Sequence, residues 1–209
     1  QVIELSKHVS DHGGSGILLF THPGQNLQSH ELLDFYQQVA DASDINIMLY
    51  NYPGINGIDL DFDILKKLSQ HPRIVAIKEC TNDIKRFSRI ADELQDNLVA
   101  LCGFEDLHHQ AFNAGASGWV CLGGNFAPGM VKDLLAFANL GHTEAADRLV
   151  KNYQPLARYF ENTSKSIQAT KYVMDRTGLV GGYCRRPRLP LSSEEKSKIN
   201  HILRHVELY

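Results

Sequence analysis

The chain has 209 residues, the size of one ordinary domain or of part of a larger one. Apolar residues make up 43% and charged residues 22%, which excludes a disordered, collagen-like or low-complexity chain. The 21 Lys and Arg against 24 Asp and Glu give a formal net charge of −3, which argues against a nucleic-acid or membrane binder. No apolar run approaches the roughly 20 residues that span a bilayer, and residues 1–11 are too charged for a secretory signal, so we expect a cytoplasmic protein.

Five short apolar runs predict the strands of a parallel sheet. Each run is bounded by Gly, Pro, Asn or Asp, and none alternates cleanly with polar residues, so both faces of the sheet should be buried. Successive runs begin about 20–30 residues apart, the size of one βα unit. The runs are residues 16–21, 45–50, 74–78, 98–102 and 118–122.

Helical periodicity fills the intervals between these runs and continues after the last of them. The interval helices include one over residues 62–68, with Asp59 or Asp61 as its N-cap, and one over 104–113 that ends at Gly115. Others are predicted over residues 1–11, around 32–39 and over 84–94. Four more helices, over 128–140, 143–159, 164–177 and 193–207, follow with no strand between them.

This order predicts an α/β protein with the architecture of a (β/α)8 TIM barrel followed by a C-terminal helical extension. A closed barrel has eight strands and five are predicted, so we expect that the sequence lacks the first three βα units, about 90 residues. The predicted division places the last five strands of the barrel in residues 1–140 and the helical extension in residues 141–209.

Two reactive side chains end neighbouring predicted strands, where barrels carry their chemistry. Lys78 follows four apolar residues in IVAIK, and burial lowers the pKa of a lysine so that the neutral amine can attack a carbonyl. Alternatively, Lys78 emerges to solvent beside Glu79. Tyr50 ends the run INIMLY, and its hydroxyl could transfer protons near Lys78. For an isolated tyrosine, however, a structural role with a hydrogen-bonded hydroxyl is the simpler interpretation.

Other polar segments are weaker signals. Glu105 and Asp106 follow the fourth run and either bind substrate hydroxyls or favour a helix N-terminus. Gly123-Gly124-Asn125 could present N–H groups to an anion. A cluster of three arginines, Arg185, Arg186 and Arg188, is usually a solvated face, and no aromatic pattern around it suggests nucleic acid.

Cysteine and histidine do not predict a metal site or a disulfide framework. The four cysteines form no CxxC pair, and the ten histidines have no ligand spacing. We therefore expect reduced thiols, no metal and no cofactor. The cysteines are Cys80, Cys102, Cys121 and Cys184.

The combination of two motifs resembles the dihydrodipicolinate synthase / N-acetylneuraminate lyase family, within the Schiff-base aldolase superfamily. Tyr50-Asn51-Tyr52-Pro53 is followed by Gly57 and, about two dozen residues on, by IVAIKE over 74–79. Gly103, the stretch GASGWVCLGGNFAP over 115–128 and the late RPRLP over 186–190 also match, in the right order. The resemblance covers nearly the whole chain.

The resemblance implies a barrel enzyme, usually a homotetramer, in which a strand lysine forms a Schiff base with a 2-oxo acid such as pyruvate. It assigns Lys78 as the nucleophile and Tyr50 as the proton shuttle. It places Val120 against the pyruvyl group, and it matches Gly103, Glu105 and Asp106 to positions that hold the hydroxylated tail in the sugar-acid lyases. The resemblance implies a small-molecule substrate, and it implies no binding to nucleic acid or to a membrane.

Four departures from the family pattern bear on the reaction. The tyrosine that the family lends across a dimer interface aligns with Gly24. The threonine pair that binds the pyruvate carboxylate belongs to the first βα units, which we expect this sequence to lack. Ile55 replaces the arginine with which dihydrodipicolinate synthases clamp a second carboxylate, and this disfavours that reaction because a buried carboxylate without a cation is costly. Leu122 stands where the sialic acid lyases have a serine.

Three functions follow as alternatives. The first is a Schiff-base lyase or aldolase acting on a 2-oxo acid. The second is a dehydratase or deaminase of the same family, acting on a 2-keto-3-deoxy sugar acid or an intermediate of hydroxyproline breakdown. The third is a non-catalytic relative or an inactive fragment, against which the retained Lys78 and Tyr50 argue.

Overall fold

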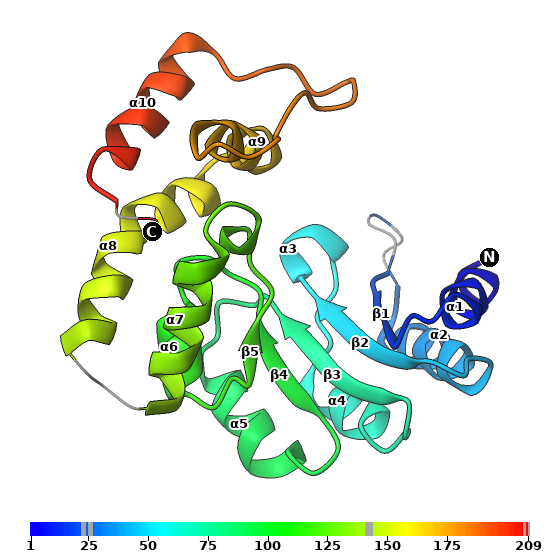
Figure 1. Cartoon of the computed structure of the whole chain (residues 1–209). Coiled ribbons are helices and arrows are strands. Elements are labelled where there is room, and N and C mark those ends of the chain that lie inside the picture. Colours follow the sequence, from blue (N-terminus) through cyan, green and yellow to red (C-terminus); the bar gives the residue numbers. More distant parts are fainter. Residues whose placement is uncertain (22–23, 25–26, 141–143, 207, 209) are drawn as a thin grey trace. The chain divides into compact units, whose positions relative to one another are not determined.

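The computed structural model describes residues 1–21, 24, 27–140, 144–206 and 208. Its strands form one parallel sheet in chain order, β1-β2-β3-β4-β5 (Figure 1). The bounds of the strands are Gly16–Leu19 for β1, Asn46–Asn51 for β2, Ile74–Glu79 for β3, Val99–Cys102 for β4 and Gly118–Trp119 for β5. The predicted parallel α/β class is confirmed.

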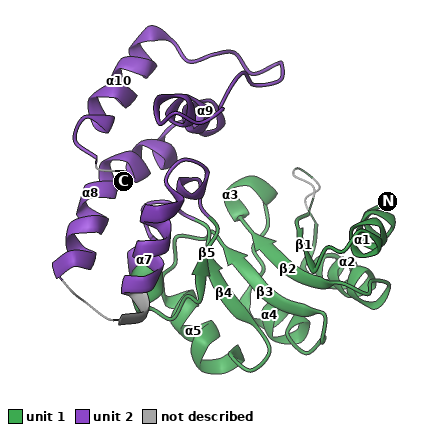
Figure 2. Cartoon of the chain, in the orientation of Figure 1, with its two compact units in different colours: residues 1–103, 110–120 green, residues 104–109, 121–209 purple. Residues whose placement is uncertain are grey.

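Helices connect these strands and follow them. The early helices are α1 (Val2–Asp11), α2 (Ser29–Asp41), α3 (Pro53–Asn56), α4 (Phe62–Leu68), α5 (Lys85–Leu94) and α6 (His108–Asn113). The 3-10 turn η1 (Gly123–Asn125) precedes α7 (Pro128–Leu140), α8 (Glu144–Asn162), α9 (Ser166–Arg176) and α10 (Ser193–Leu203). The chain divides into two compact units, residues 1–103 with 110–120 and residues 104–109 with 121–209 (Figure 2).

The two faces of the sheet in the first unit are buried to different extents. Leu49, Ile77 and Ala100 lie side by side in the register and are at most 2% exposed, as expected of a face covered by helices. On the other face, Leu18 and Val99 keep 46% and 40% of their surface exposed. The prediction that both faces are buried is therefore wrong at these positions, because the sheet is open and the described residues include no strand facing them.

Several predicted boundaries are corrected by local hydrogen bonds. Asp61, not Asp59, caps α4, since its carboxylate accepts from the Ile64 N–H at 2.9 Å. The helix predicted from residue 104 begins only at His108, because the Glu105 N–H donates to the Glu161 carboxylate and the Glu105 carbonyl is bound by the His108 ring. The Glu105 carbonyl, which the first turn of a helix from residue 104 would use, is thus bound by a side chain instead.

Other differences are small. The fifth strand ends at Trp119 instead of residue 122, and the short helix α3 was not predicted; Pro53 begins it and Gly57, at φ 77°, ends it. The helices predicted over 143–159 and 193–207 each include a residue outside the described part of the chain. The residues on either side of Gly24, the position aligned with the family's tyrosine, also lie outside it.

The second unit has its own helical core. Tyr153, Leu156 and Ala157 of α8 are fully buried, and the Phe160 ring lies 5.6 Å from that of Phe126. The helix α8 packs against α7, α9 and α10. The predicted division at residue 140 stays a prediction.

Candidate active site

A register shift places Tyr50 beside Lys78. Ile47 pairs with Ile74 but Met48 pairs with Ala76, so β3 carries one extra residue, Val75. Without that bulge the same alignment would set Tyr50 opposite Ile77 instead of Lys78. With it, the two reactive side chains lie at the C-terminal ends of adjacent strands, on the less buried face of the sheet.

The amine of Lys78 lies over an aromatic ring. Its Nζ is 4.1 Å from the centroid of the Tyr50 ring, which in turn lies 5.1 Å from the Phe20 ring and 6.2 Å from the Tyr52 ring. No carboxylate of the described residues forms an ion pair with Lys78, so its amine is not held by an opposite charge. An amine in these surroundings is accessible to react with a carbonyl.

Gly103 packs directly against the lysine stem. A Cβ at this position would lie 2.0 Å from the Cys80 Sγ and 2.8 Å from the Lys78 Cε. The Gly103 N–H donates to the Glu79 carbonyl at 3.0 Å, which continues the β3–β4 pairing past the end of the strands. Only glycine fits here without displacing the lysine or the cysteine.

We predict that Gly103→Ala destabilises the protein by about 1–3 kcal/mol, the usual cost of forcing a methyl group into packed space. Urea unfolding measures the change. Gly129→Ala is the control, since a Cβ at Gly129 of α7 meets nothing within 4 Å. Equal midpoints for the two variants would contradict the packing argument.

The opposite face of the same strand ends holds a buried charge network. Glu79 is 1% exposed, and Arg86 donates from Nε to its Oε2 at 3.1 Å. Arg86 also binds the Asp59 carboxylate at 3.1 Å and the Leu60 carbonyl at 2.6 Å. Asn51 donates to Asp59 at 2.7 Å and to Glu79 at 3.2 Å, so the network ties the ends of β2 and β3 together beneath Tyr50 and Lys78.

Two other predicted site residues lie in the first unit. Ile55 is on α3 with 48% of its surface exposed. Val120 directly follows β5, and its N–H donates to the Cys102 carbonyl at 2.9 Å. Tyr50, Lys78 and Gly103 are thus brought together in one cluster, and Ile55 and Val120 border the same sheet.

Glu105 and Asp106 belong to the second unit. Glu105 is 2% exposed, and its two carboxylate oxygens accept from the Leu122 N–H and the Tyr153 hydroxyl. The Asp106 carbonyl accepts from the Gln154 side chain at 3.3 Å. The carboxylate of Glu105 is therefore bound within its own unit.

Burial raises the pKa of the Glu105 carboxyl to about 7; the hydrogen bonds from Tyr153 and Leu122 oppose the rise, and the nearby Glu161 carboxylate adds to it. Because the folded value lies above the ordinary 4.5, protonated Glu105 favours the fold. We predict that this group alone lowers the free energy of unfolding by up to about 3 kcal/mol as pH rises from about 4.5 to about 7, with no further change above.

A Glu105→Gln variant isolates this contribution. His108 acts in the opposite sense, because burial lowers its pKa to about 4 and its charging below pH 6.5 destabilises the fold. Glu105→Gln keeps His108, so the difference between the two pH–stability curves from urea unfolding belongs to Glu105. Parallel curves for wild type and variant would contradict the prediction.

Sequence reasoning missed two residues that bind buried carboxylates, Arg86 at Glu79 and Tyr153 at Glu105. Arg86 reads as one of several charges on α5, and only its place beside Phe87 and one turn before Ile90, both buried, hints at its role. Tyr153 reads as a core aromatic of α8. No local pattern links either residue to a partner that is 7 or 48 positions away.

The described part of the chain was compared with the requirements of a metal site and of a membrane-spanning helix. No group of three or more His, Cys, Asp or Glu side chains there is arranged to hold a metal ion. No helix among the described residues is both long and apolar enough to cross a bilayer. None of the four cysteines, all of which belong to this described part, forms a disulfide bond.

Comparison with known sequences gives a consistent result. The model of the "Dihydrodipicolinate synthetase family" matches residues 1–206. A 4-hydroxy-tetrahydrodipicolinate synthase of Methanothrix thermoacetophila is 33% identical over 97% of this chain and 69% of its own length. One of Geobacter sulfurreducens is 31% identical over the whole chain and 71% of its own length.

Solved structures agree with the sequences. A dihydrodipicolinate synthase of Aquifex aeolicus superposes with a TM-score of 0.90 at 25% identity, covering 97% of this chain and 69% of that one. One of Acinetobacter baumannii, complexed with pyruvate, superposes with a TM-score of 0.89 at 27% identity over the same shares. These neighbours confirm the predicted (β/α) barrel class. The chain belongs to the dihydrodipicolinate synthetase family, a family of lyases.

Proposed function

We propose that the protein is a lyase that forms a Schiff base between Lys78 and a 2-oxo acid. The observation that carries the proposal is the pairing of Tyr50 with Lys78 at the ends of β2 and β3, with the Lys78 Nζ 4.1 Å from the Tyr50 ring. The match of nearly the whole chain to the family supports it, and the pyruvate bound in the Acinetobacter baumannii enzyme suggests pyruvate as the acid.

The chemistry follows from the amine and the tyrosine. The Lys78 amine attacks the ketone carbon of pyruvate and water leaves, which gives an imine that draws electrons from the neighbouring methyl carbon. Loss of a proton from that methyl group then gives an enamine, which adds to the carbonyl carbon of an aldehyde. In the reverse direction, cleavage of the carbon–carbon bond in the condensed imine releases the aldehyde and leaves the enamine. Tyr50 takes and returns protons in these steps. The packing of Gly103 against the lysine stem keeps the amine at the strand end.

Exchange of the pyruvate methyl protons in D2O tests this proposal without a second substrate. Each cycle between imine and enamine replaces a methyl proton by deuterium, which proton NMR follows directly. We predict that Tyr50→Phe slows the exchange by about 10²–10⁴-fold, the usual contribution of a positioned acid or base. Tyr183→Phe is the control, because Tyr183 is 93% exposed in the second unit.

An unchanged rate in Tyr50→Phe would remove the tyrosine from the mechanism. Absence of exchange in the wild type, with the native protein folded, would contradict the Schiff-base proposal for pyruvate.

The second substrate is a separate question. The curated relatives carry the name 4-hydroxy-tetrahydrodipicolinate synthase, which favours condensation of the enamine with an aldehyde. The exposed Ile55, in place of an arginine, favours a partner without a second carboxylate at that point. Product analysis distinguishes the alternatives. An aldolase-type lyase cleaves its substrate to pyruvate and an aldehyde, or condenses the two in the reverse direction. A dehydratase or deaminase releases water or ammonia and leaves the carbon chain intact.

The roles expected of Val120, Glu105 and Asp106, the homotetramer and the cytoplasmic location stay predictions.

A further inference from the structure

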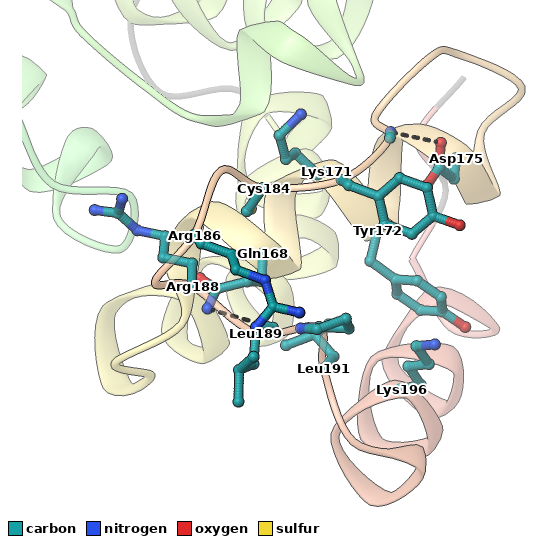
Figure 3. Close-up of a pocket in the computed structure, with 13 residues that line it drawn as sticks. Gln168, Lys171, Tyr172, Asp175, Cys184, Arg186, Arg188, Leu189, Leu191 and Lys196 are labelled. Atoms are coloured by element: carbon teal, nitrogen blue, oxygen red, sulfur yellow. Dashed lines mark hydrogen bonds between the residues drawn. The ribbon is translucent and has the colours of Figure 1, made fainter.

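The second unit contains a cavity of about 350 Å³ that the proposed chemistry does not use. It lies between α9, the segment 177–192 and α10 (Figure 3). Its lining carries an excess of positive charge, with Lys171, Arg186, Arg188 and Lys196 against a single acid, Asp175.

The positive charges of the cavity have no carboxylate partners within the described residues. Lys171, Arg186, Arg188 and Lys196 form no ion pair there, and the single acid, Asp175, accepts from the Gly181 and Gly182 N–H groups at 2.9 and 3.2 Å. Close by on α10, by contrast, acids and bases compensate each other, as Lys198 does with Glu194 at 2.9 Å. A protein of net charge −3 therefore places four cations against one acid around this hollow, and no ion pair of the described residues involves them.

The walls of the cavity are fixed by hydrogen bonds at several points. Lys171 of α9 donates to the Gly181 carbonyl, and a Cβ at Gly181 would lie 1.9 Å from the Lys171 carbonyl oxygen, so the segment approaches α9 as closely as a backbone can. Further along, Gln168 donates to the Leu189 carbonyl at 3.3 Å, an interaction drawn in Figure 3. Tyr172 links α9 to Asn200 of α10 at 3.1 Å. The segment that carries Arg186 and Arg188 is thus hydrogen-bonded to α9 on both sides of the two arginines.

The chemistry of the lining selects a ligand class. Arginine presents a planar fork that fits carboxylate and phosphate oxygens, and several cations around one hollow favour a ligand with more than one negative charge. The volume suits a small organic molecule and not a macromolecule. Tyr172, Leu189 and Leu191 add apolar surface for its carbon frame.

We propose that this cavity binds a small organic polyanion, held by Arg186 and Arg188 with Lys171 and Lys196 at the other walls. The site does not depend on the Schiff-base function, because all of its residues belong to the second unit.

Calorimetric titration of the native protein with pyrophosphate and with citrate tests the site at low salt, where screening is weakest. At least one of the two anions is expected to bind at a single saturable site; pyrophosphate alone would indicate a phosphate ligand and citrate alone a carboxylate ligand. Arg186→Gln and Arg188→Gln are each expected to weaken binding by about tenfold, the loss of one charge-assisted contact. Arg185→Gln is the matched control, since Arg185 neighbours Arg186 but does not line the cavity.

Two results would overturn the proposal. One is that neither anion binds. The other is that Arg185→Gln weakens binding as much as the cavity variants do, which would show general attraction to a basic surface. Unfolding midpoints of the variants without ligand establish that each is folded.

Discussion

Replacing Lys78 by arginine is expected to abolish exchange of the pyruvate methyl protons, with a loss of at least about 10⁴-fold, as for removal of a covalent nucleophile. Arginine keeps the positive charge over the Tyr50 ring but stays protonated at any physiological pH, so it cannot attack the ketone. Proton NMR in D2O measures the rate. Lys85→Arg is the matched control, because Lys85 is an exposed residue at the start of α5.

The stability of Lys78→Arg shows whether a loss of exchange comes from the missing amine or from a damaged fold. The variant is expected to keep the unfolding free energy of the wild type within about 1 kcal/mol, since no ion pair of the described residues depends on Lys78. Retention of exchange well above the uncatalysed rate would show that another group reacts with the 2-oxo acid.

Replacing Arg86 by alanine is expected to lower the free energy of unfolding by about 3–5 kcal/mol, the cost of leaving a buried charge unpaired. Burial raises the pKa of Glu79, and the Arg86 charge is the main influence that opposes the rise. Its removal also takes a donor from the Asp59 carboxylate and from the Leu60 carbonyl. Urea unfolding gives the value.

Arg73→Ala is the control for Arg86→Ala. Arg73 lies 3.8 Å from the Asp44 carboxylate, whose side chain is 98% exposed, and such surface pairs contribute about 0–1 kcal/mol. A second change, Glu79→Gln in the Arg86→Ala background, should recover part of the loss because it removes the unpaired charge. Equal effects of Arg86→Ala and Arg73→Ala would contradict the account of the network.

The strands and most helices could be predicted because their signals are local. Apolar runs bounded by turn residues place β2, β3 and β4 to within a residue at each end. The bulge at Val75 could not be predicted, since it depends on which residues of two strands pair, and nothing in IVAIKE distinguishes the bulged register. Yet that bulge is what brings Tyr50 opposite Lys78.

The reactive residues of the candidate site could be predicted, but the contacts that surround them could not. Lys78 and Tyr50 are visible as reactive residues at apolar strand ends, and the family motif raises them above the structural alternatives. Glu105 was expected either to bind substrate hydroxyls or to stand at a helix N-terminus. Its carboxylate is buried against Tyr153, a contact between residues 48 positions apart. Burial of Glu79 and its pairing with Arg86 likewise depend on tertiary contacts, which composition and periodicity do not encode.

Trapping of the imine is the most direct test of the central claim, that Lys78 forms the Schiff base. The native protein is incubated with pyruvate, reduced with borohydride and digested, and the peptides are analysed by mass spectrometry. The account predicts a reduced pyruvyl adduct on Lys78, which is absent without pyruvate and absent in Lys78→Arg. An adduct on another lysine, or no adduct from a protein that exchanges pyruvate protons, would contradict it.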